Sequence, residues 1–436
     1  MQRIALPPLE RRLQLRYQKM VHAHLRSAPA LAPGVPSLPD SCSAFAATQG
    51  AWRFLNNDRV TLPALVEPLR DVGRSRAATT KAAFALLVHD WSKLCYRPGR
   101  ASGGKTDVLQ LTHATDRGYD LTTSLLVSAD DGSPLAPMEM HCRTGQGVLS
   151  TRPGTRPASH LEQVLPTMRA SASWHVSKPL LHVIDREADS VDHYRRWDAA
   201  GHQFLVRADD RRVLWGEKRC LLSAIRKQLR RSRKFVHAGE ASYHGRLATL
   251  WIAETEVVLD RPAKKKIQGK SVERPGRALK LRFLVVQLRN DHGQVLAEWM
   301  LLSNAPRAWA VSEHLARCYY WRWRIESFFK LLKSHGQQLE CWQQESGPAI
   351  ARRLLVAAMA CVVVWQLEHD DTAEGRAFKD ALVRLSGRQM KRTKPHTAPA
   401  LLAGLWVLLS MLALLEHTDL NDLKRLAAKL SYPPTG

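Results

Sequence analysis

Residues 84–90 read FALLVHD, and residues 180–185 read LLHVID. Each stretch is a short apolar run that ends in an aspartate, a pattern typical of a buried β-strand. Residues 119–128 and 135–142 are β-compatible and are separated by the turn signal Asp130-Asp131-Gly132, and residues 161–170 are a helix candidate. A helical stretch follows Asp185, and a third strand is expected over residues 203–207, which read QFLVR. Strands that alternate with helices predict a layered α/β core. Ligand sites in such sheets lie at strand ends, so Asp90 and Asp185 are candidates for a shared site.

The composition points to a polyanionic partner. The chain has 436 residues, which is enough for two or three domains, and 45% of them are apolar, which excludes a disordered protein. Lys and Arg number 65 against 40 Asp and Glu, for a net charge of +25. Such a surplus favours binding to phosphate backbones, because cationic side chains release the counterions held there. Nucleic acid is therefore the expected partner, and an anionic membrane surface is the alternative.

The cysteines and the N-terminus indicate a cytoplasmic protein. Seven cysteines are scattered singly with no CxxC pair, which excludes a disulfide framework or a zinc module, and no signal-peptide pattern is present. Residues 398–415 reach about the minimum length for a membrane span. Pro399, Gly404 and Ser410 interrupt that stretch, so a buried or subunit-pairing helix is expected instead. Residues 351–367 are expected to form a core helix, and no membrane partner is predicted.

Changes in pattern along the chain predict three regions. Residues 1–75 are expected to be helical, with a turn at 56–58 that is compatible with a small DNA-binding unit. Residues 76–345 carry the α/β core, interrupted by a basic, β-rich insertion at about 210–298. Residues 346–436 are expected to be helical and to pair subunits.

Several basic positions have two open interpretations. Arg53 in the first region is a candidate DNA contact and equally a surface cation. The insertion carries a run of basic residues from Arg226 to Lys234 and a second from Lys264 to Lys270, the latter expected as a loop. Both runs suit phosphate contacts or a solvated basic face.

Residues 314–336, HLARCYYWRWRIESFFKLLKSHG, are the most informative segment. As one helix, they predict a polar stripe and an apolar stripe for packing. The polar stripe consists of Tyr319, Arg322, Glu326, Lys330 and Lys333. The apolar stripe consists of Trp321, Ile325, Phe328 and Leu332. An ordinary surface helix with ion pairs four residues apart is the alternative.

The three acids together predict a metal site. Asp90 and Asp185 from adjacent strands and Glu326 from a facing helix can hold two Mg²⁺ ions about 4 Å apart. Ligation by acids alone suits hard cations, and no His or Cys cluster offers a rival site. Arg322, Lys330 and Lys333 would then hold a phosphate beside the ions, with the Tyr319 hydroxyl. Glu187 and Asp189 are expected to support the site without binding metal.

The same residues resemble a known family. The spacing Tyr319-x2-Arg322-x3-Glu326-x6-Lys333 is similar to the signature of bacterial DDE transposases of the insertion-sequence-four family. DREAD at 185–189 and ALLVHD ending at Asp90 resemble the segments around that family's two catalytic aspartates. FAATQGAWRFLNND at 45–58 is similar to its N-terminal DNA-binding region. The resemblance covers about residues 43 to 345.

This resemblance implies a ribonuclease H-like (retroviral integrase-like) core, and a DNA-end-binding domain over residues 1–75. It implies cut-and-paste transposition through nicking, hairpin formation and opening, and strand transfer, with Mg²⁺ as cofactor and Mn²⁺ as a substitute. The implied partners are double-stranded DNA, as transposon terminal inverted repeats and target, and a second copy of the chain. By motif position, Tyr319, Arg322 and Lys333 would grip a phosphate.

The resemblance also adds weaker candidates for DNA contact. Arg207 matches an arginine that lines the same site. Trp299 and Trp323 resemble tryptophans that receive a base flipped from the hairpin, although a Trp in such apolar surroundings is equally expected in the core.

One departure from the family pattern follows the first aspartate. Trp91-Ser92-Lys93 stand where small hydroxyl residues are common, and Lys93 is expected to point away from Asp90 along the strand. The alternatives to a transposase are an inactive or domesticated protein that binds DNA ends without cutting, and a nuclease of the same core that cuts without strand transfer.

Overall fold

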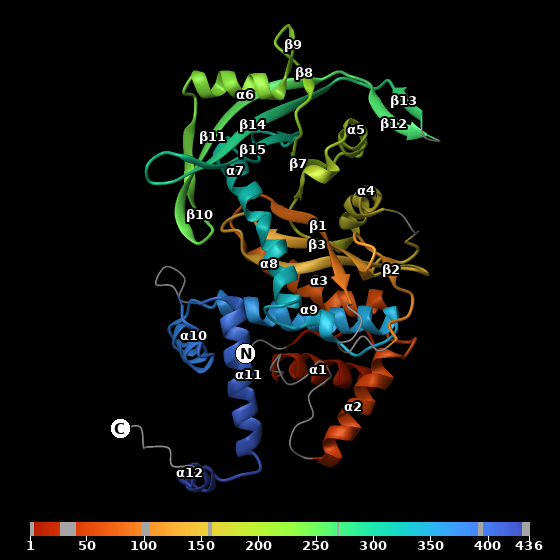
Figure 1. Cartoon of the computed structure of the whole chain (residues 1–436), viewed down its shortest axis with the longest axis vertical. Helices are drawn as coiled ribbons and strands as arrows, with labels where there is room; N and C mark the ends of the chain where they lie inside the picture. Colours follow the sequence, from red (N-terminus) through yellow and green to blue (C-terminus); the bar gives the residue numbers. More distant parts are fainter. Residues whose placement is uncertain are drawn as a thin grey trace.

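One mixed sheet runs through the molecule in the order β5-β4-β3-β1-β6-β7-β15-β14-β11-β8-β9 (Figure 1). The computed structural model describes residues 4–26, 41–96, 104–155, 159–267, 270–390 and 396–429. The first strands are β1 (Ala85–Cys95), β2 (Leu109–Gln110), β3 (Arg117–Ser128), β4 (Pro134–Thr144), β5 (Gly147–Ser150), β6 (Leu180–Ile184) and β7 (Gln203–Arg207). The remaining strands of the sheet are β8 (Arg212–Trp215), β9 (Lys218–Leu221), β10 (Val236–Tyr243), β11 (Arg246–Leu259), β14 (Leu279–Arg289) and β15 (Val295–Ser303).

The half of the sheet around β1 has two kinds of pairing. β1, β3 and β4 form an antiparallel meander, whereas β6 and β7 run parallel to β1 and to each other. The predicted turn between β3 and β4 is present, with Gly132 at a φ of +73° that favours glycine. The strand expected over 203–207 is confirmed, and the one expected over 180–185 is present over Leu180–Ile184, with Asp185 directly after it. The prediction that the first strand ends at Asp90 is wrong, since β1 continues to Cys95 while it pairs with β3.

The predicted insertion does not stand apart from this sheet. β15 pairs directly with β7, so β8 to β11, β14 and β15 extend the sheet across its other half. The basic run that begins at Arg226 lies on α6 (Leu222–Arg231), which packs its apolar side on the extension. Of the loop expected over 264–270, residues 264–267 lie on β12 (Ala263–Ile267) and Lys270 begins β13 (Lys270–Arg274), which pairs with β12, while 268–269 lie outside the described residues. The sequence KIQGKSVER has no apolar alternation that would indicate a strand, so the pairing of β12 with β13 is not visible in it.

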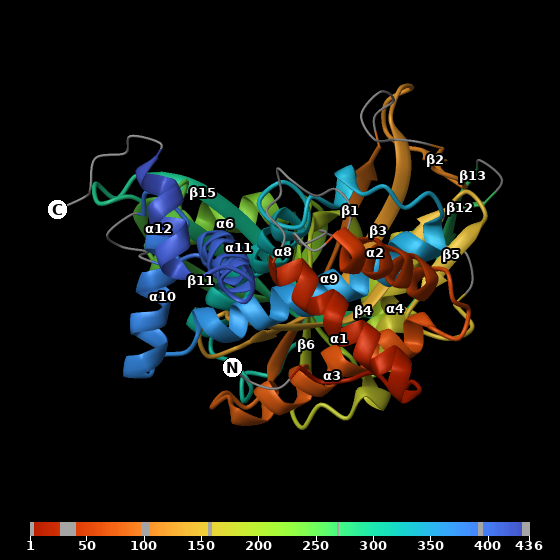
Figure 2. The same cartoon turned by 90° about the horizontal axis from the view of Figure 1, so that it is seen from below.

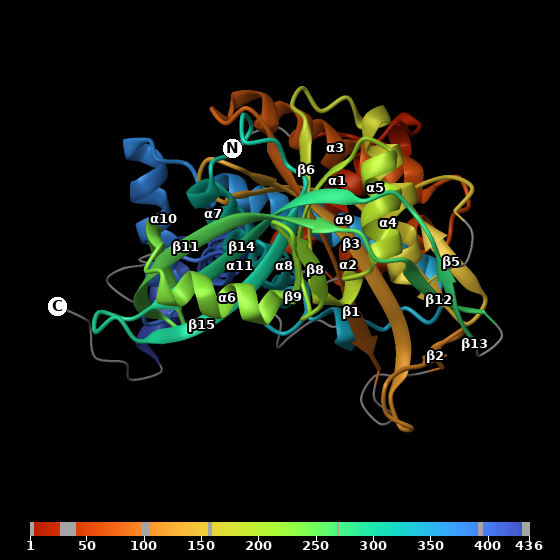
Figure 3. The same ribbon diagram turned by 90° about the horizontal axis from the view of Figure 1, so that it is seen from above.

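Helices cover both faces of the sheet (Figures 1 and 3). On one side lie α4 (His160–Ala170), η1 (Ser171–Trp174), η2 (Arg186–Ala188) and α5 (Val191–Ala199). On the other side lie α3 (Leu62–Thr79), α7 (Ser312–Trp321), α8 (Trp323–Leu332), η3 (Leu339–Cys341) and α9 (Gly347–Glu368). The sheet is therefore the middle layer of an α/β molecule, as the alternating pattern predicts.

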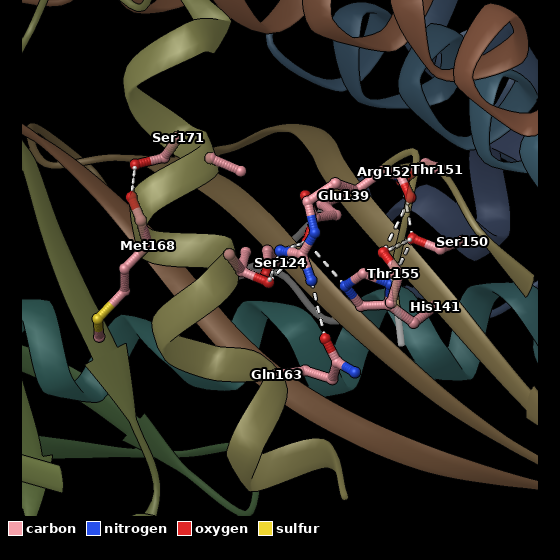
Figure 4. Close-up of polar contacts among 12 residues, drawn as sticks. Ser124, Glu139, His141, Ser150, Thr151, Arg152, Thr155, Gln163, Met168 and Ser171 are labelled. Carbon is pink, nitrogen blue, oxygen red and sulfur yellow. Dashed lines mark hydrogen bonds and ion pairs between the residues drawn. The ribbon is translucent and has the colours of Figure 1, made fainter. Parts of the chain in front are cut away.

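α4 is attached to the sheet by a buried polar cluster (Figure 4). Glu139 of β4 is fully buried and accepts hydrogen bonds from Arg152 at 3.0 Å and from Thr167 of α4 at 2.6 Å. His141 lies 2.7 Å from the same oxygen, and Arg152 also donates to Gln163 of α4 at 2.8 Å. Burial alone would raise the pKa of Glu139, but His141, Arg152 and Thr167 lower it. The network thus holds α4 at a fixed place on β4.

The N-terminal and C-terminal helices pack against each other below the sheet (Figure 2). α1 (Arg11–Arg26) and α2 (Ser41–Leu55) lie beside α9, and Arg352 of α9 donates to the carbonyls of Leu55 and Val60, both at 2.8 Å. These carbonyls flank the predicted 56–58 turn, which the structure confirms. The division of the chain into three regions stays a prediction.

Two C-terminal helices are long and apolar enough to cross a membrane by length and composition. The apolar window of α9 is 89% buried inside the protein, which confirms a core helix. α11 (Ala398–Leu415) buries its first half on α9 and α10 (Ala373–Leu385), but only 44% of its window is covered. Its second half extends away from the body towards α12 (Leu420–Ala428) (Figure 1).

Candidate active site

Asp90 and Asp185 lie where two parallel strands part. The last paired residues of β1 and β6 are His89 and Ile184, and the next residue on each strand is the aspartate. Asp90 accepts a hydrogen bond from the Trp91 amide at 2.9 Å, and Asp185 accepts one from the Arg186 amide at 2.7 Å. The prediction that these acids come from adjacent strands is confirmed.

Glu326 comes from a helical segment on the same face. The segment expected as one helix is two, because α7 and α8 are separated at Arg322, although its backbone keeps a helical conformation (φ −48°, ψ −34°). α8 ends at Leu332, four residues before the predicted end. The predicted apolar stripe is buried, with Ile325, Phe328 and Leu332 fully enclosed. This packing turns Glu326 towards the two aspartates.

One guanidinium contacts all three acids. Arg322 is 5% exposed and donates from Nη1 to Asp90 Oδ2 at 2.8 Å. Its Nη2 donates to Glu326 Oε1 at 2.9 Å and lies 3.7 Å from Asp185 Oδ2. Since a guanidinium is only a few ångströms across, the three carboxylates converge on one small volume. Arg322 was expected on a polar stripe facing phosphate, but here it is buried among the acids.

The surroundings shift the pKa values of Asp90 and Asp185 in opposite directions. Burial raises the pKa of Asp90 to about 6, although Arg322 opposes this shift. Burial would also raise the pKa of Asp185, but Arg322, the Arg186 amide and Tyr319 lower it. Tyr319 is 4% exposed and donates to Asp185 Oδ1 at 3.1 Å, and burial raises its own pKa. Arg322 contacts all three acids directly, and Arg207 adds a second positive charge that acts on Asp185.

The donor chemistry of this cluster fits a hard divalent cation. All three acids offer oxygen ligands, and a buried carboxylate with a raised pKa gains from a nearby cation. In the described part of the chain, no group of three or more His, Cys, Asp or Glu side chains is placed so that it could hold a metal ion. The guanidinium of Arg322 lies between the three acids in this structure.

The other basic residues near the site differ in solvent exposure and in their contacts. Lys330 is exposed on α8. Lys333 follows the end of α8 and donates to the carbonyl of Lys93, with Glu340 at 3.3 Å. Arg207, half-buried at the end of β7, faces the same cluster and lowers the pKa of Asp185. Lys93 donates to Thr112 and not to Asp90, as expected from strand alternation.

Trp299 and Trp323 meet beside the acids. Their ring centroids are 5.7 Å apart in an edge-to-face arrangement, and Trp299 also lies 5.5 Å from Tyr319. Trp299 is 6% exposed and Trp323 is half-buried. The two indoles therefore belong to one aromatic wall of the site, and their role in base stacking stays a prediction.

Arg53 lies outside this cluster. It is exposed on α2 and lines a groove of about 930 Å³ between α1 and α2. The basic side chains of this groove are Arg11, Arg12, Arg16, Lys19, Arg53 and Arg59. The guanidinium of Arg16 packs directly on Gly50, where a Cβ would approach it to 2.4 Å.

Two acids of the 185–189 segment hydrogen-bond to neighbouring protein groups, and their supporting role at the site stays a prediction. Asp189 accepts hydrogen bonds from Tyr194, Arg211 and the Asp209 amide. Glu187 contacts Trp91 at 2.8 Å and His160 at 2.9 Å. His160 did not stand out in the sequence, because a single His in a polar stretch carries no local pattern.

Comparison with known proteins identifies the family. The transposase DDE domain matches residues 140–363, just over half of the chain, a segment that includes Asp185 and Glu326 and begins after Asp90. No curated protein matches the sequence. Among solved structures, a piggyBac transposase synaptic complex with hairpin DNA is similar at 10% identity and a TM-score of 0.35, over 97% of this chain and 76% of that one. The family assignment rests on the domain match alone. The chain belongs to the transposase DDE domain family, and it is a DNA transposase, a metal-dependent enzyme that cleaves DNA.

Proposed function

We propose that Asp90, Asp185 and Glu326 are the catalytic acids and that they hold two Mg²⁺ ions at a DNA phosphodiester. The observation that carries this proposal is the contact of all three carboxylates with the single guanidinium of Arg322. A two-metal site needs carboxylates that converge, because its ions lie about 4 Å apart, and these three acids converge on Arg322. When bound, such ions activate a water or a 3′-hydroxyl and stabilise the leaving oxygen.

The chain's own residues then have distinct tasks. Asp90 and Asp185 are held in place by backbone amides, and Tyr319 fixes one oxygen of Asp185. Arg322 keeps the acids together in the free protein and becomes available to a DNA phosphate when other cations neutralise them. Arg207, Lys330 and Lys333 supply further positive charge around the strand.

The finer family assignment is also a proposal. The DREAD segment and the Tyr-Arg-Glu-Lys spacing support a transposase of the insertion-sequence-four type. The order β4-β3-β1-β6-β7, antiparallel on one side of β1 and parallel on the other, supports a ribonuclease H-like core. Cut-and-paste transposition with a hairpin intermediate follows from that assignment, with Trp299 and Trp323 as the stacking platform for a flipped base.

The N-terminal helices are proposed to bind the terminal inverted repeats. The groove between α1 and α2, with six basic side chains, supports this role and places Arg53 within it. A second copy of the chain is proposed to complete the complex through the exposed half of α11. Its apolar surface there includes Val407, Met411, Leu412, Leu414 and Leu415.

The decisive experiment changes one acid. Glu326→Gln is expected to keep binding to end-bearing DNA and to abolish 3′ nicking, because an amide is a poorer metal ligand of similar shape. Binding is measured by electrophoretic mobility shift, and nicking by product analysis in Mg²⁺ and Mn²⁺. Glu313→Gln, on the preceding helix α7, is the matched control and is expected to nick normally.

Unchanged nicking by Glu326→Gln would remove the proposed mechanism. If the parent protein binds ends but never nicks in either metal, the description as an inactive end-binding relative would stand instead. Lys93, the feature that suggested an inactive protein, does not contact Asp90.

A further inference from the structure

Asp90 and Asp185 are not backbone-paired with each other, although Asp90 still pairs with Thr123 of β3. β1 and β6 are hydrogen-bonded only as far as His89 and Ile184. Beyond that pair, β1 continues along β3, while the other segment turns into η2. The separation of the Asp90 and Asp185 carboxylates must therefore be fixed by side chains.

One side-chain hydrogen bond spans this gap. The indole Nε1 of Trp91, the residue after Asp90, donates to Glu187 Oε2 at 2.8 Å. Glu187 lies on η2, the single turn that begins directly after Asp185. The bond thus joins the two aspartate segments immediately past the last paired residues.

His160 of α4 strengthens the link. Its ring stacks on Trp91 with centroids 4.2 Å apart and an interplanar angle of 26°, and its Nε2 lies 2.9 Å from Glu187 Oε1. Glu187 therefore receives one donor on each oxygen. Burial opposes a charged His160, but Asp120 and Glu187 raise its pKa, which favours the form with two donors.

α4 provides a rigid base for His160. The cluster around Glu139 holds Gln163 and Thr167 of this helix on β4 (Figure 4). Asp189, at the other end of the 185–189 segment, is held by Tyr194, Arg211 and the Asp209 amide. The turn after Asp185 is thus anchored at both ends, towards β1 by Glu187 and towards β7 by Asp189.

We propose that Trp91, Glu187 and His160 form a brace that sets the separation of Asp90 and Asp185 for metal binding. The three are positioning residues, since they act on the metal site through the backbone of the two aspartates. This inference rests on the proposed role of Asp90 and Asp185. A side chain that orients a metal ligand commonly affects metal affinity by about 10- to 100-fold.

The test measures Mn²⁺ binding to the full-length protein without DNA, by isothermal titration calorimetry. Trp91→Phe keeps an aromatic ring against His160 but removes the indole N–H, so Mn²⁺ affinity is expected to fall about tenfold. Glu187→Gln removes the charge but keeps an acceptor for the indole, so its loss is expected to be clearly smaller. Trp215→Phe is the matched control, because it removes one indole hydrogen bond, to Thr255, in the β8–β11 region.

A second readout separates positioning from general destabilisation. Trp91→Phe is expected to need about tenfold more Mn²⁺ for half-maximal nicking, but to reach nearly the parent rate at saturating Mn²⁺. Glu187→Ala, at a position that is 55% exposed, is expected to fold and to match Trp91→Phe. The double change Trp91→Phe with Glu187→Ala is expected to be no worse than either alone, since both remove the same bond.

Three results would overturn the brace. The first is Mn²⁺ affinity in Trp91→Phe equal to that of the parent protein. The second is a loss of Mn²⁺ affinity in the control Trp215→Phe as large as that in Trp91→Phe. The third is an equally large loss in Glu187→Gln, which would indicate that the charge of Glu187 matters and not its hydrogen bond. Asp90→Asn separates this failure from failure of the proposed function. If Asp90→Asn abolishes Mn²⁺ binding while Trp91→Phe leaves it unchanged, only the brace is wrong; if Asp90→Asn binds normally, the proposed metal site itself is wrong.

Discussion

At the scale of single residues, Arg322 is the centre of the candidate site. Its guanidinium replaces, in the free protein, part of the positive charge that divalent ions would supply. Removing one partner of a buried charge cluster is costly, because the remaining charges stay desolvated. The contact also restrains the acids before any DNA arrives.

Arg322→Gln is therefore expected to lower stability in EDTA by about 2 kcal/mol, less than a fully buried pair would lose because Glu326 is 44% exposed. Mn²⁺ should raise the melting temperature of this variant more than that of the parent, since the ion restores the missing charge. Differential scanning fluorimetry with and without Mn²⁺ measures both effects. An equal rise in the two proteins would show that the guanidinium and the ion do not compete for one place.

The acids of the site were predictable and their shared partner was not. Asp90, Asp185 and Glu326 each stand in a local pattern that a sequence displays, a strand or a helix face. The spacing of four residues predicts the contact of Arg322 with Glu326. Its contact with Asp90 joins residues 232 positions apart and depends on how α8 packs on β1, which no local pattern encodes.

At the scale of elements, periodicity predicted which segments form strands and helices better than where they end. β1 runs past Asp90 because β3 offers a partner for its whole length, and a partner strand is a tertiary property. The helical segment that carries Glu326 stops at Leu332, where Lys333 leaves the helical conformation (φ −92°, ψ −113°) and donates to the Lys93 carbonyl of β1. The hairpin of β12 and β13 was missed for the same reason, since pairing decides between strand and loop.

α11 gives the element-scale prediction. Met411 and Leu415 lie four residues apart on its exposed half, at 49% and 39% exposure, so they share one face. Changing both to Lys is expected to leave single-end binding intact and to reduce the proposed two-protomer complex with DNA to one protomer. Light scattering of the purified complex measures its mass.

Val295→Lys changes a similarly exposed apolar residue on β15 and is the control for added charge. A two-protomer complex that survives the Met411 and Leu415 changes would place the subunit contact elsewhere.

At the scale of the whole molecule, a buried histidine joins distant parts of the chain. His24 of α1 lies 2.6 Å from Gln337, beyond α8, and its backbone carbonyl accepts a hydrogen bond from Trp406 of α11 at 3.3 Å. Arg353 of α9 is 3.5 Å from the other ring nitrogen. Burial and Arg353 lower the pKa of His24 to about 3.

This depressed pKa predicts a loss of stability in mild acid. Below about pH 6.5 the unfolded chain binds a proton at His24 that the folded chain excludes. The contribution of the neutral His24 to the free energy of unfolding is complete above pH 6.5. It falls by up to about 1.4 kcal/mol per pH unit as the pH drops towards the pKa of His24 in the folded protein. His24→Gln should flatten the fall in unfolding free energy between pH 6.5 and 5, measured by urea denaturation. An unchanged slope in the variant would assign the acid sensitivity to other groups.

The pairing of β15 with β7 also bears on how such a protein can be shortened or recombined. The last strand of the inserted region, β15, pairs with β7 through Leu301, Leu302 and Ser303. This pairing joins the inserted region to the central sheet. A deletion that closed the chain from Ala208 to Asn304 would leave β7 as a bare edge, and bare edges invite aggregation. Chimaeras with related proteins should therefore exchange the inserted region only together with a β7 that matches its last strand.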